Sequence, residues 1–119
     1  MAFTGTATFA MITNSICRIT GLSLLHGASG TISLAAGTGD KKMPASFQAG
    51  AGEGPIAGTN FTMADAIECT VHNTGAGATN PVIAITKSGT VPADFLLTLA
   101  NQDGANDGTA LEIYVKFHT

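Results

Sequence analysis

The acidic residues near the carboxyl end of the chain are the first candidates for chemistry. Asn101, Asp103 and Asp107 lie in a glycine-punctuated stretch and could offer oxygen atoms to a calcium ion. An EF-hand loop also requires glycine at its sixth position and a free glutamate at its twelfth. Counted from Asn101, these positions hold Asn106 and Glu112, and Glu112 already belongs to a strongly alternating stretch. Because Asp-Gly dipeptides are common turn formers, we predict a hairpin loop and no metal site.

The histidines are the candidates for a transition-metal site. His26, His72 and His118 lie far apart in the sequence, without the close spacing that zinc sites use on a strand or a helix. We interpret each as a polar surface group. A small jelly-roll enzyme that holds a metal on these histidines remains an alternative, which metal analysis of the purified protein would test.

The remaining motifs point to no reaction. The stretch GEGPIA at 52–57 imitates part of a dinucleotide fingerprint, but Pro55 and the residues after it begin no helix. The chain has no GxSxG elbow, Walker loop or HExxH motif. Asp65 would lie on an apolar strand face without a clear partner, which favours a hydrogen-bonded turn over a catalytic acid. We therefore predict no catalytic residue, no cofactor and no enzymatic activity.

Cysteine chemistry also favours a structural role. Cys17 and Cys69 form no CxxC pair, and the chain starts without a positively charged region before its mildly apolar stretch. We expect no export signal, and hence two buried thiols in place of a disulfide.

The composition predicts one domain with an unusually neutral surface. The chain has 119 residues, enough for a single core, and only 11% of them are charged, against about 25% in ordinary soluble proteins. A surface with so few charges tends to associate, so the composition indicates assembly with other molecules.

The same composition argues against two classes of partner. The formal net charge is −3, and the basic residues are scattered, so the positive patch that phosphate backbones require is missing. No window reaches the roughly 18 apolar residues of a membrane-spanning helix. We expect neither nucleic acid nor a membrane as partner.

The spacing of apolar residues predicts an all-β chain. Turn-forming residues interrupt the sequence about every ten positions, and Thr, Val, Ile and Phe fill the segments between them. The clearest segment is the last one, where Leu111, Ile113, Val115 and Phe117 alternate with polar residues. Strands are predicted over residues 6–13, 15–25, 31–36, 41–48, 61–71, 81–87, 93–100 and 111–118.

Several positions carry more specific predictions. Gly21 interrupts the alternation of its strand and suits a bulge that shifts the strand's phase. Pro44 cannot donate a ladder hydrogen bond, which indicates an edge strand. A hairpin turn is expected at 26–30, and a long glycine-rich surface loop at 49–59. Residues 62–68 could instead start a short helix, because Thr62 and Asp65 have N-cap and N3 spacing.

These elements favour one architecture. About eight short strands without a convincing long helix fit a two-sheet antiparallel sandwich or a jelly roll. A parallel sheet would need crossover helices that the pattern does not contain. We predict a single all-β domain over residues 1–119.

In size, composition and strand pattern over the whole chain, the sequence resembles the small decoration, or cement, proteins of tailed-phage capsids. The resemblance implies a homo-oligomer, often a trimer, that assembles in the host cytoplasm, becomes part of the virion and clamps the lattice of major capsid protein. Segments that order on a partner are the candidate contacts. They comprise Met1, Ala2, Phe3, Gly50, Gly52, Gly54, Pro55 and Ile56.

A ligand-binding or adhesive β-sandwich module is the main alternative. Its loops would recognise a glycan or a peptide at one end of the sandwich. Sugar-binding modules commonly stack rings on exposed aromatic side chains, and this chain has no tryptophan and a single tyrosine, Tyr114. This composition weakens the carbohydrate alternative.

Overall fold

The protein is an all-β molecule. A computed structural model describes residues 3–13, 16–33, 40–42, 67–74, 82–88 and 96–117. Within them no helix is long and apolar enough to cross a membrane. The strands are β1 (Phe3–Met11), β2 (Ile16–Leu24), β3 (Ser29–Ser33), β4 (Lys41–Lys42), β5 (Ile67–Asn73), β6 (Ile83–Ser88), β7 (Leu96–Asn101) and β8 (Gly108–Phe117).

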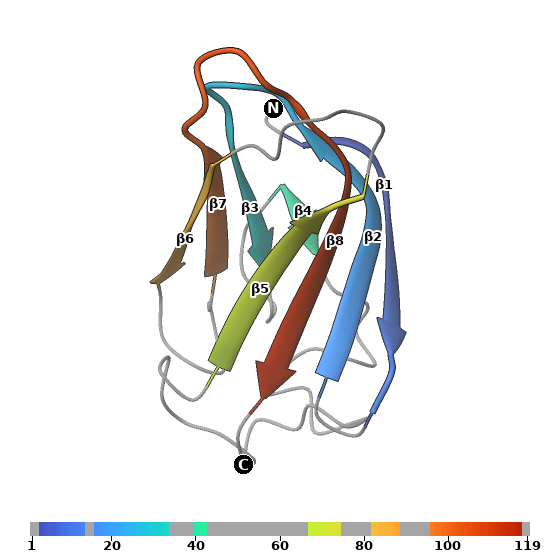
Figure 1. Cartoon of the computed structure of the whole chain (residues 1–119). Helices are drawn as coiled ribbons and strands as arrows, with labels where there is room; N and C mark the ends of the chain where they lie inside the picture. Colours follow the sequence, from blue (N-terminus) through green and yellow to red (C-terminus); the bar gives the residue numbers. More distant parts are fainter. Residues whose placement is uncertain are drawn as a thin grey trace.

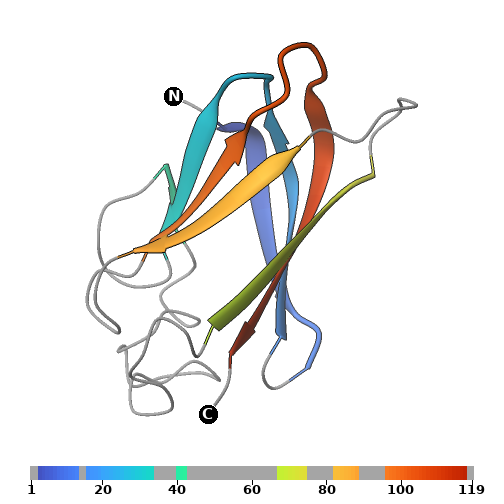
Figure 2. The same ribbon diagram turned by 60° about the vertical axis from the view of Figure 1, so that its left-hand side comes forward.

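The strands form two packed sheets, which confirms the predicted sandwich. One sheet has the order β1-β2-β8-β5 and the other the order β4-β3-β7-β6 (Figure 1). Neighbouring strands are antiparallel, except that the two-residue β4 pairs in parallel with β3. Figure 2 shows that the sheets meet at the end where β2 leads to β3 and β7 leads to β8, and diverge towards the other end.

The core lies between the sheets and follows the alternation in the sequence. In β8, Leu111, Ile113 and Val115 are buried, whereas Glu112 and Tyr114 between them are half-buried on the outer face. This pattern arises because successive side chains of a strand point to opposite faces of the sheet. The buried apolar side chains are Phe3, Cys17, Ile19, Leu22, Leu24, Ile32, Leu97, Leu99, Leu111, Ile113 and Val115.

Three adjacent strands each carry an irregularity at the same level of the sheet. The register shifts between Gly5 and Thr8 in the β1–β2 pair, and twice in the β2–β8 pair, next to Gly21 and Ala110. All three residues Gly5, Gly21 and Ala110 have positive φ angles, of 90°, 88° and 52°. Aligned bulges of this kind increase the local twist and bend the sheet.

The bulge at Gly21 keeps the core continuous. Cys17 and Ile19 are buried before it, and Leu22 and Leu24 are buried after it, so the buried positions change from one parity to the other. Without the additional residue, the second half of β2 would turn its leucines to solvent. The predicted phase-shifting bulge is confirmed.

Two predicted hairpins are wrong. The β2–β3 connection at 25–28 and the β7–β8 connection at 102–107 both cross from one sheet to the other, because β2 and β8 belong to one sheet and β3 and β7 to the other. Short loops rich in turn formers predict a reversal of direction, but they do not say whether the returning strand pairs with the previous one.

The other predicted elements agree where they are described. Lys41–Lys42 forms a sheet edge, as predicted for that segment, while Pro44 and the loop at 49–59 lie outside the described residues. Residues 67–73 are a strand, so the helix alternative for 62–68 is wrong at 67–68, and residues 62–66 lie outside the described residues.

The close approach of β1 to Gly21 gives a testable prediction. A Cβ atom at Gly21 would collide with the carbonyl oxygen of Thr6, and the positive φ adds strain for any other residue. Gly21→Ala should therefore lower the free energy of unfolding by about 2–4 kcal/mol in chemical denaturation. Gly104→Ala is the control, because nothing lies within 4 Å of a Cβ atom there, and an equal loss in both variants would contradict the argument.

Candidate functional site

The end of the sandwich where the chain crosses between sheets is organised around Asn101, the last residue of β7. Its side chain is 2% exposed. The side-chain Nδ2 donates to the carbonyl oxygens of Leu24 (3.1 Å) and Asn106 (3.0 Å). The backbone of Asn101 exchanges hydrogen bonds with Gly27 and Ala28, so one residue holds both crossover loops. We call this end of the molecule, residues 25–28 and 101–108, the tip.

Asp103 closes the first turn of the β7–β8 loop. Its Oδ1 accepts hydrogen bonds from the backbone amides of Ala105 and Asn106, both at 2.8 Å, and its own amide donates to Asn101 Oδ1. The amide hydrogen bonds from Ala105 and then Asn106 hold the pKa of Asp103 below its usual value. The carboxylate therefore acts as an internal acceptor in an Asx-type turn.

Asp107 joins the two crossover loops to each other. Its Oδ1 accepts a hydrogen bond from the backbone amide of His26 at 2.9 Å and lies 2.6 Å from His26 Nδ1. The amide of His26, followed by its ring, lowers the pKa of Asp107. The acidic loop of the sequence thus uses its carboxylates to hold its own backbone and that of its neighbour.

The outer face of the β1-β2-β8-β5 sheet carries a second group of polar side chains. The Tyr114 hydroxyl donates to Glu112 Oε1 at 2.6 Å, and this hydrogen bond raises the pKa of Tyr114, while Arg18 opposes the shift. The His72 ring meets the Tyr114 ring edge-on, with centroids 6.0 Å apart. Across the strands, Glu68 lies opposite Lys116.

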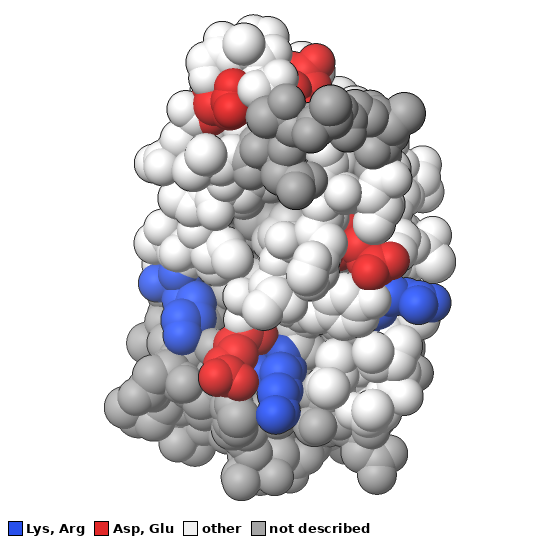
Figure 3. All heavy atoms as spheres, in the orientation of Figure 1, with Lys and Arg blue, Asp and Glu red and all other residues white. Residues whose placement is uncertain are grey.

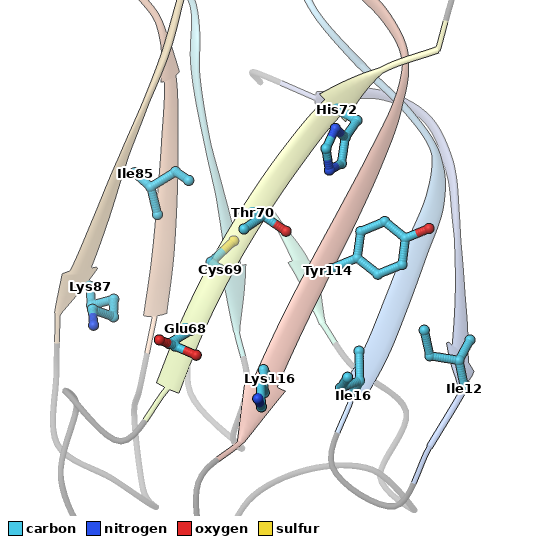
Figure 4. A pocket seen from close by; sticks show the side chains of 10 residues that line it. All are labelled: Ile12, Ile16, Glu68, Cys69, Thr70, His72, Ile85, Lys87, Tyr114 and Lys116. Atoms are coloured by element: carbon cyan, nitrogen blue, oxygen red, sulfur yellow. The ribbon is translucent and has the colours of Figure 1, made fainter.

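A shallow hollow adjoins this face. Its volume is about 750 Å³, and Figure 4 shows its lining side chains spread over the strands from β6 to the end of β1. Cys69, Ile85 and Lys87 line it together with residues of the outer face, so the hollow reaches both sides of β5. The complete lining is Ile12, Ile16, Glu68, Cys69, Thr70, His72, Ile85, Lys87, Tyr114 and Lys116.

The two cysteines are free, as predicted. Both pair with Val115 of β8, Cys17 from β2 and Cys69 from β5, so two strand spacings of about 4.8 Å separate them. A disulfide needs Cα atoms within about 7 Å. Burial raises the pKa of Cys17 to about 11 and that of Cys69 to about 12, and both thiols are therefore protonated at neutral pH.

The structure places only some of the predicted contact residues. Phe3 is 2% exposed, and its ring packs over Gly30 of β3, so Phe3 belongs to the core and not to a free contact arm. The sequence misled here because an apolar residue at a chain end looks the same whether it anchors a strand or extends from it. The other predicted contacts lie outside the described residues: Met1, Ala2, Gly50, Gly52, Gly54, Pro55 and Ile56.

The candidate metal ligands have separate roles where they are described. His26 contacts Asp107 at the tip, and His72 contacts Tyr114 on the outer face of β5, while His118 lies outside the described residues. Asp65, weighed as a catalytic acid, also lies outside them. Among the residues that the structure describes, no group of three or more His, Cys, Asp or Glu could hold a metal ion.

Sequence reasoning missed the cross-strand cluster around Tyr114. Arg18, Thr70 and Tyr114 come from three strands and become neighbours only through the β2–β8 and β5–β8 registers. The alternation of β8 placed Tyr114 on the polar face, but no local signal gave its neighbours.

No protein family, curated protein or solved structure matches this chain.

The hydrogen bonds of Asn101 predict a large effect of a small chemical change. Asn101→Asp replaces the Nδ2 donor with an oxygen that faces the carbonyl groups of Leu24 and Asn106. We expect the free energy of unfolding to fall by about 3 kcal/mol or more. Gln102→Glu makes the same amide-to-acid change on an exposed neighbour and should be nearly neutral. Similar thermal denaturation of the two variants would refute the role of Asn101.

The raised thiol pKa values predict slow alkylation of the native protein. At pH 8, iodoacetamide should modify Cys17 and Cys69 at least about 100-fold more slowly in the folded protein than in denaturant, because the thiolate is the nucleophile. Intact-mass spectrometry should show two adducts after unfolding and none before. A denatured protein that accepts no label without reductant would instead reveal a disulfide.

Proposed function

We propose that this protein is a non-enzymatic structural component of a virus particle, which stabilises the shell by oligomeric surface contacts in the manner of a capsid decoration protein. The observation that carries the proposal is a surface poor in charge that exposes large apolar side chains. The proposal also rests on the resemblance in size, composition and strand pattern to decoration proteins of tailed phages.

The described surface offers apolar contacts at both ends and along one side. Ile12, in the turn after β1, is 44% exposed, Leu25 in the tip is 50% exposed, and Val82 next to the tip is 60% exposed. On the face shown in Figure 3 the charged side chains are few, and acidic and basic ones lie next to each other in places, with white neutral areas between these groups. Surfaces that become buried between subunits favour this composition, because burial of a charge costs desolvation energy.

The polar groups of the chain also support a structural role. At the tip, Asp103 and Asp107 accept hydrogen bonds from backbone amides, and on the outer face Tyr114 donates to Glu112. These side chains stabilise loops and strands, which is the task of a rigid building block. A rigid tip that joins both sheets would hold its own exposed Leu25 and the neighbouring Val82 in a fixed position for a partner.

A ligand-binding module is the second candidate function, and the hollow around β5 favours it. The volume of about 750 Å³ lies in the range of small-molecule sites, and the lining combines apolar side chains with the ring of Tyr114. The ligand would be a glycan or a peptide segment that packs against this ring.

Co-sedimentation with capsid shells tests the first proposal. The proposal requires that the genome of this chain also encode a major capsid protein, and the shells would be assembled from that protein. The wild-type protein should sediment with them, and Leu25→Asp/Val82→Asp should weaken binding at least about tenfold, because it places charges in a desolvated contact. Thr86→Asp, on the exposed face of β6, is the matched control.

Two outcomes separate the candidates. A protein that ignores the shells at all concentrations contradicts the decoration role. If such a protein binds a component of a glycan array, and Tyr114→Ala abolishes that binding, the module function replaces it.

A further inference from the structure

The four sheet edges of the sandwich are not equally protected against pairing with another strand. Natural edge strands avoid it by bulges, by very short length, by lysines or by charges that point inward. β1 carries a bulge after Gly5, and β4 has two residues, both lysine. In β6, Lys87 lies opposite the buried Leu97 and therefore points to the inner face.

The remaining edge, β5, has none of these devices. Its seven residues contain no proline, lysine or glycine, and they pair with β8 in continuous register. Among the residues that the structure describes, no strand pairs with its other side. An edge of this length, in continuous register and without a pairing strand among the described residues, is a template for strand addition.

The register shows which backbone groups this edge offers. The amide of Thr74 donates to the carbonyl oxygen of Ala110 in β8. Asn73 pairs with Leu111, so Thr74 and Ala110 are the next pair in the same register. In an antiparallel ladder the backbone groups of alternate residues point to the same neighbour. The backbone groups of Thr70 and His72 thus point to β8, and those of Cys69 and Val71 point to the other edge of β5, where no described strand pairs.

We propose that this edge binds the same edge of a second copy of the chain, in an antiparallel pair centred on Thr70. This arrangement places Thr70 opposite Thr70, and Glu68 of each copy opposite His72 of the other. Both Glu68 and His72 are exposed on the outer face. On the inner face, Cys69 of each copy lies opposite Val71 of the other, and both positions are partly buried and apolar. The sequence of the edge is therefore complementary to itself in polarity, with polar residues opposite polar ones on the outer face and apolar residues opposite apolar ones on the inner face.

The pairing also covers apolar surface. Ile85 of β6 is 38% exposed and lines the hollow beside Cys69. Strand β5 of the second copy would extend the sheet next to Cys69 and place the inward-facing Cys69 and Val71 of that copy above this opening. The four-stranded sheet would become a continuous eight-stranded sheet across a two-fold axis.

This contact does not depend on the proposed function. It concerns the isolated protein, whereas binding to shells concerns another surface and another partner. An isologous contact gives an even number of subunits, in contrast to the trimer that the resemblance implies.

The solution mass and a designed disulfide test the pairing. Light scattering coupled to size exclusion should give twice the monomer mass. Thr70 would occupy a non-hydrogen-bonded pair with Cα atoms about 4.5 Å apart, which is within the range for a disulfide. Oxidised Thr70→Cys should therefore form a covalent dimer through position 70, whereas Thr86→Cys, on the exposed face of the other edge strand β6, should not.

A charge variant provides the complementary measurement. Thr70→Lys places like charges directly opposite each other and should raise the dissociation constant at least about tenfold, with an unchanged circular dichroism spectrum. Thr86→Lys should leave the dimer intact. A wild-type protein that is monomeric or trimeric, a Thr70→Cys variant that forms no covalent dimer, or a Thr70→Lys variant that dimerises normally would each overturn the proposal.

Discussion

The hydrogen bonds of a single buried amide hold the two sheets together at the tip. Asn101 lies in β7, and its side chain donates to Leu24 at the end of β2 in the other sheet and to Asn106 in its own loop. Its backbone pairs with Gly27 and Ala28 of the β2–β3 loop, just before β3 in its own sheet. An amide can satisfy donors and acceptors in one place, and leaving any of them unpaired in the interior is costly. The two sheets are joined at this end and diverge towards the other (Figure 2). The tip therefore sets the angle between the two sheets.

The bulges are the second constraint, because they restore the inward direction of the apolar side chains partway along the strands. β2 stays buried along its whole inner face only because an additional residue at Gly21 restores the phase. Glycine is required at this position, where the chain has a positive φ and the carbonyl of Thr6 leaves no space for a side chain. Ala110 adopts a similar conformation on β8 at the cost of some backbone strain.

The described surface combines polar side chains that pair with each other, exposed apolar side chains and the edge strand β5. Charges that are present lie beside partners, such as Asp107 beside His26 and Glu68 opposite Lys116. Within the described part of the chain, Ile12, Leu25 and Val82 are exposed, and no strand pairs with the outer side of β5. A molecule of this kind gains most when neighbours cover these areas, and this consideration links the proposed shell contacts with the proposed pairing of two copies.

The sequence by itself determined the strands, the inward side chains of β8 and the bulge at Gly21, because alternation and glycine conformation are local properties. It also determined that the carboxylates of the acidic loop stabilise turns, since Asp103 acts on amides two and three residues away. Only the tertiary structure decided that the loops before β3 and β8 cross between sheets, that Phe3 belongs to the core, and that Tyr114 meets Arg18. Each of these depends on which distant strands become neighbours, and the packing of the whole core selects that arrangement.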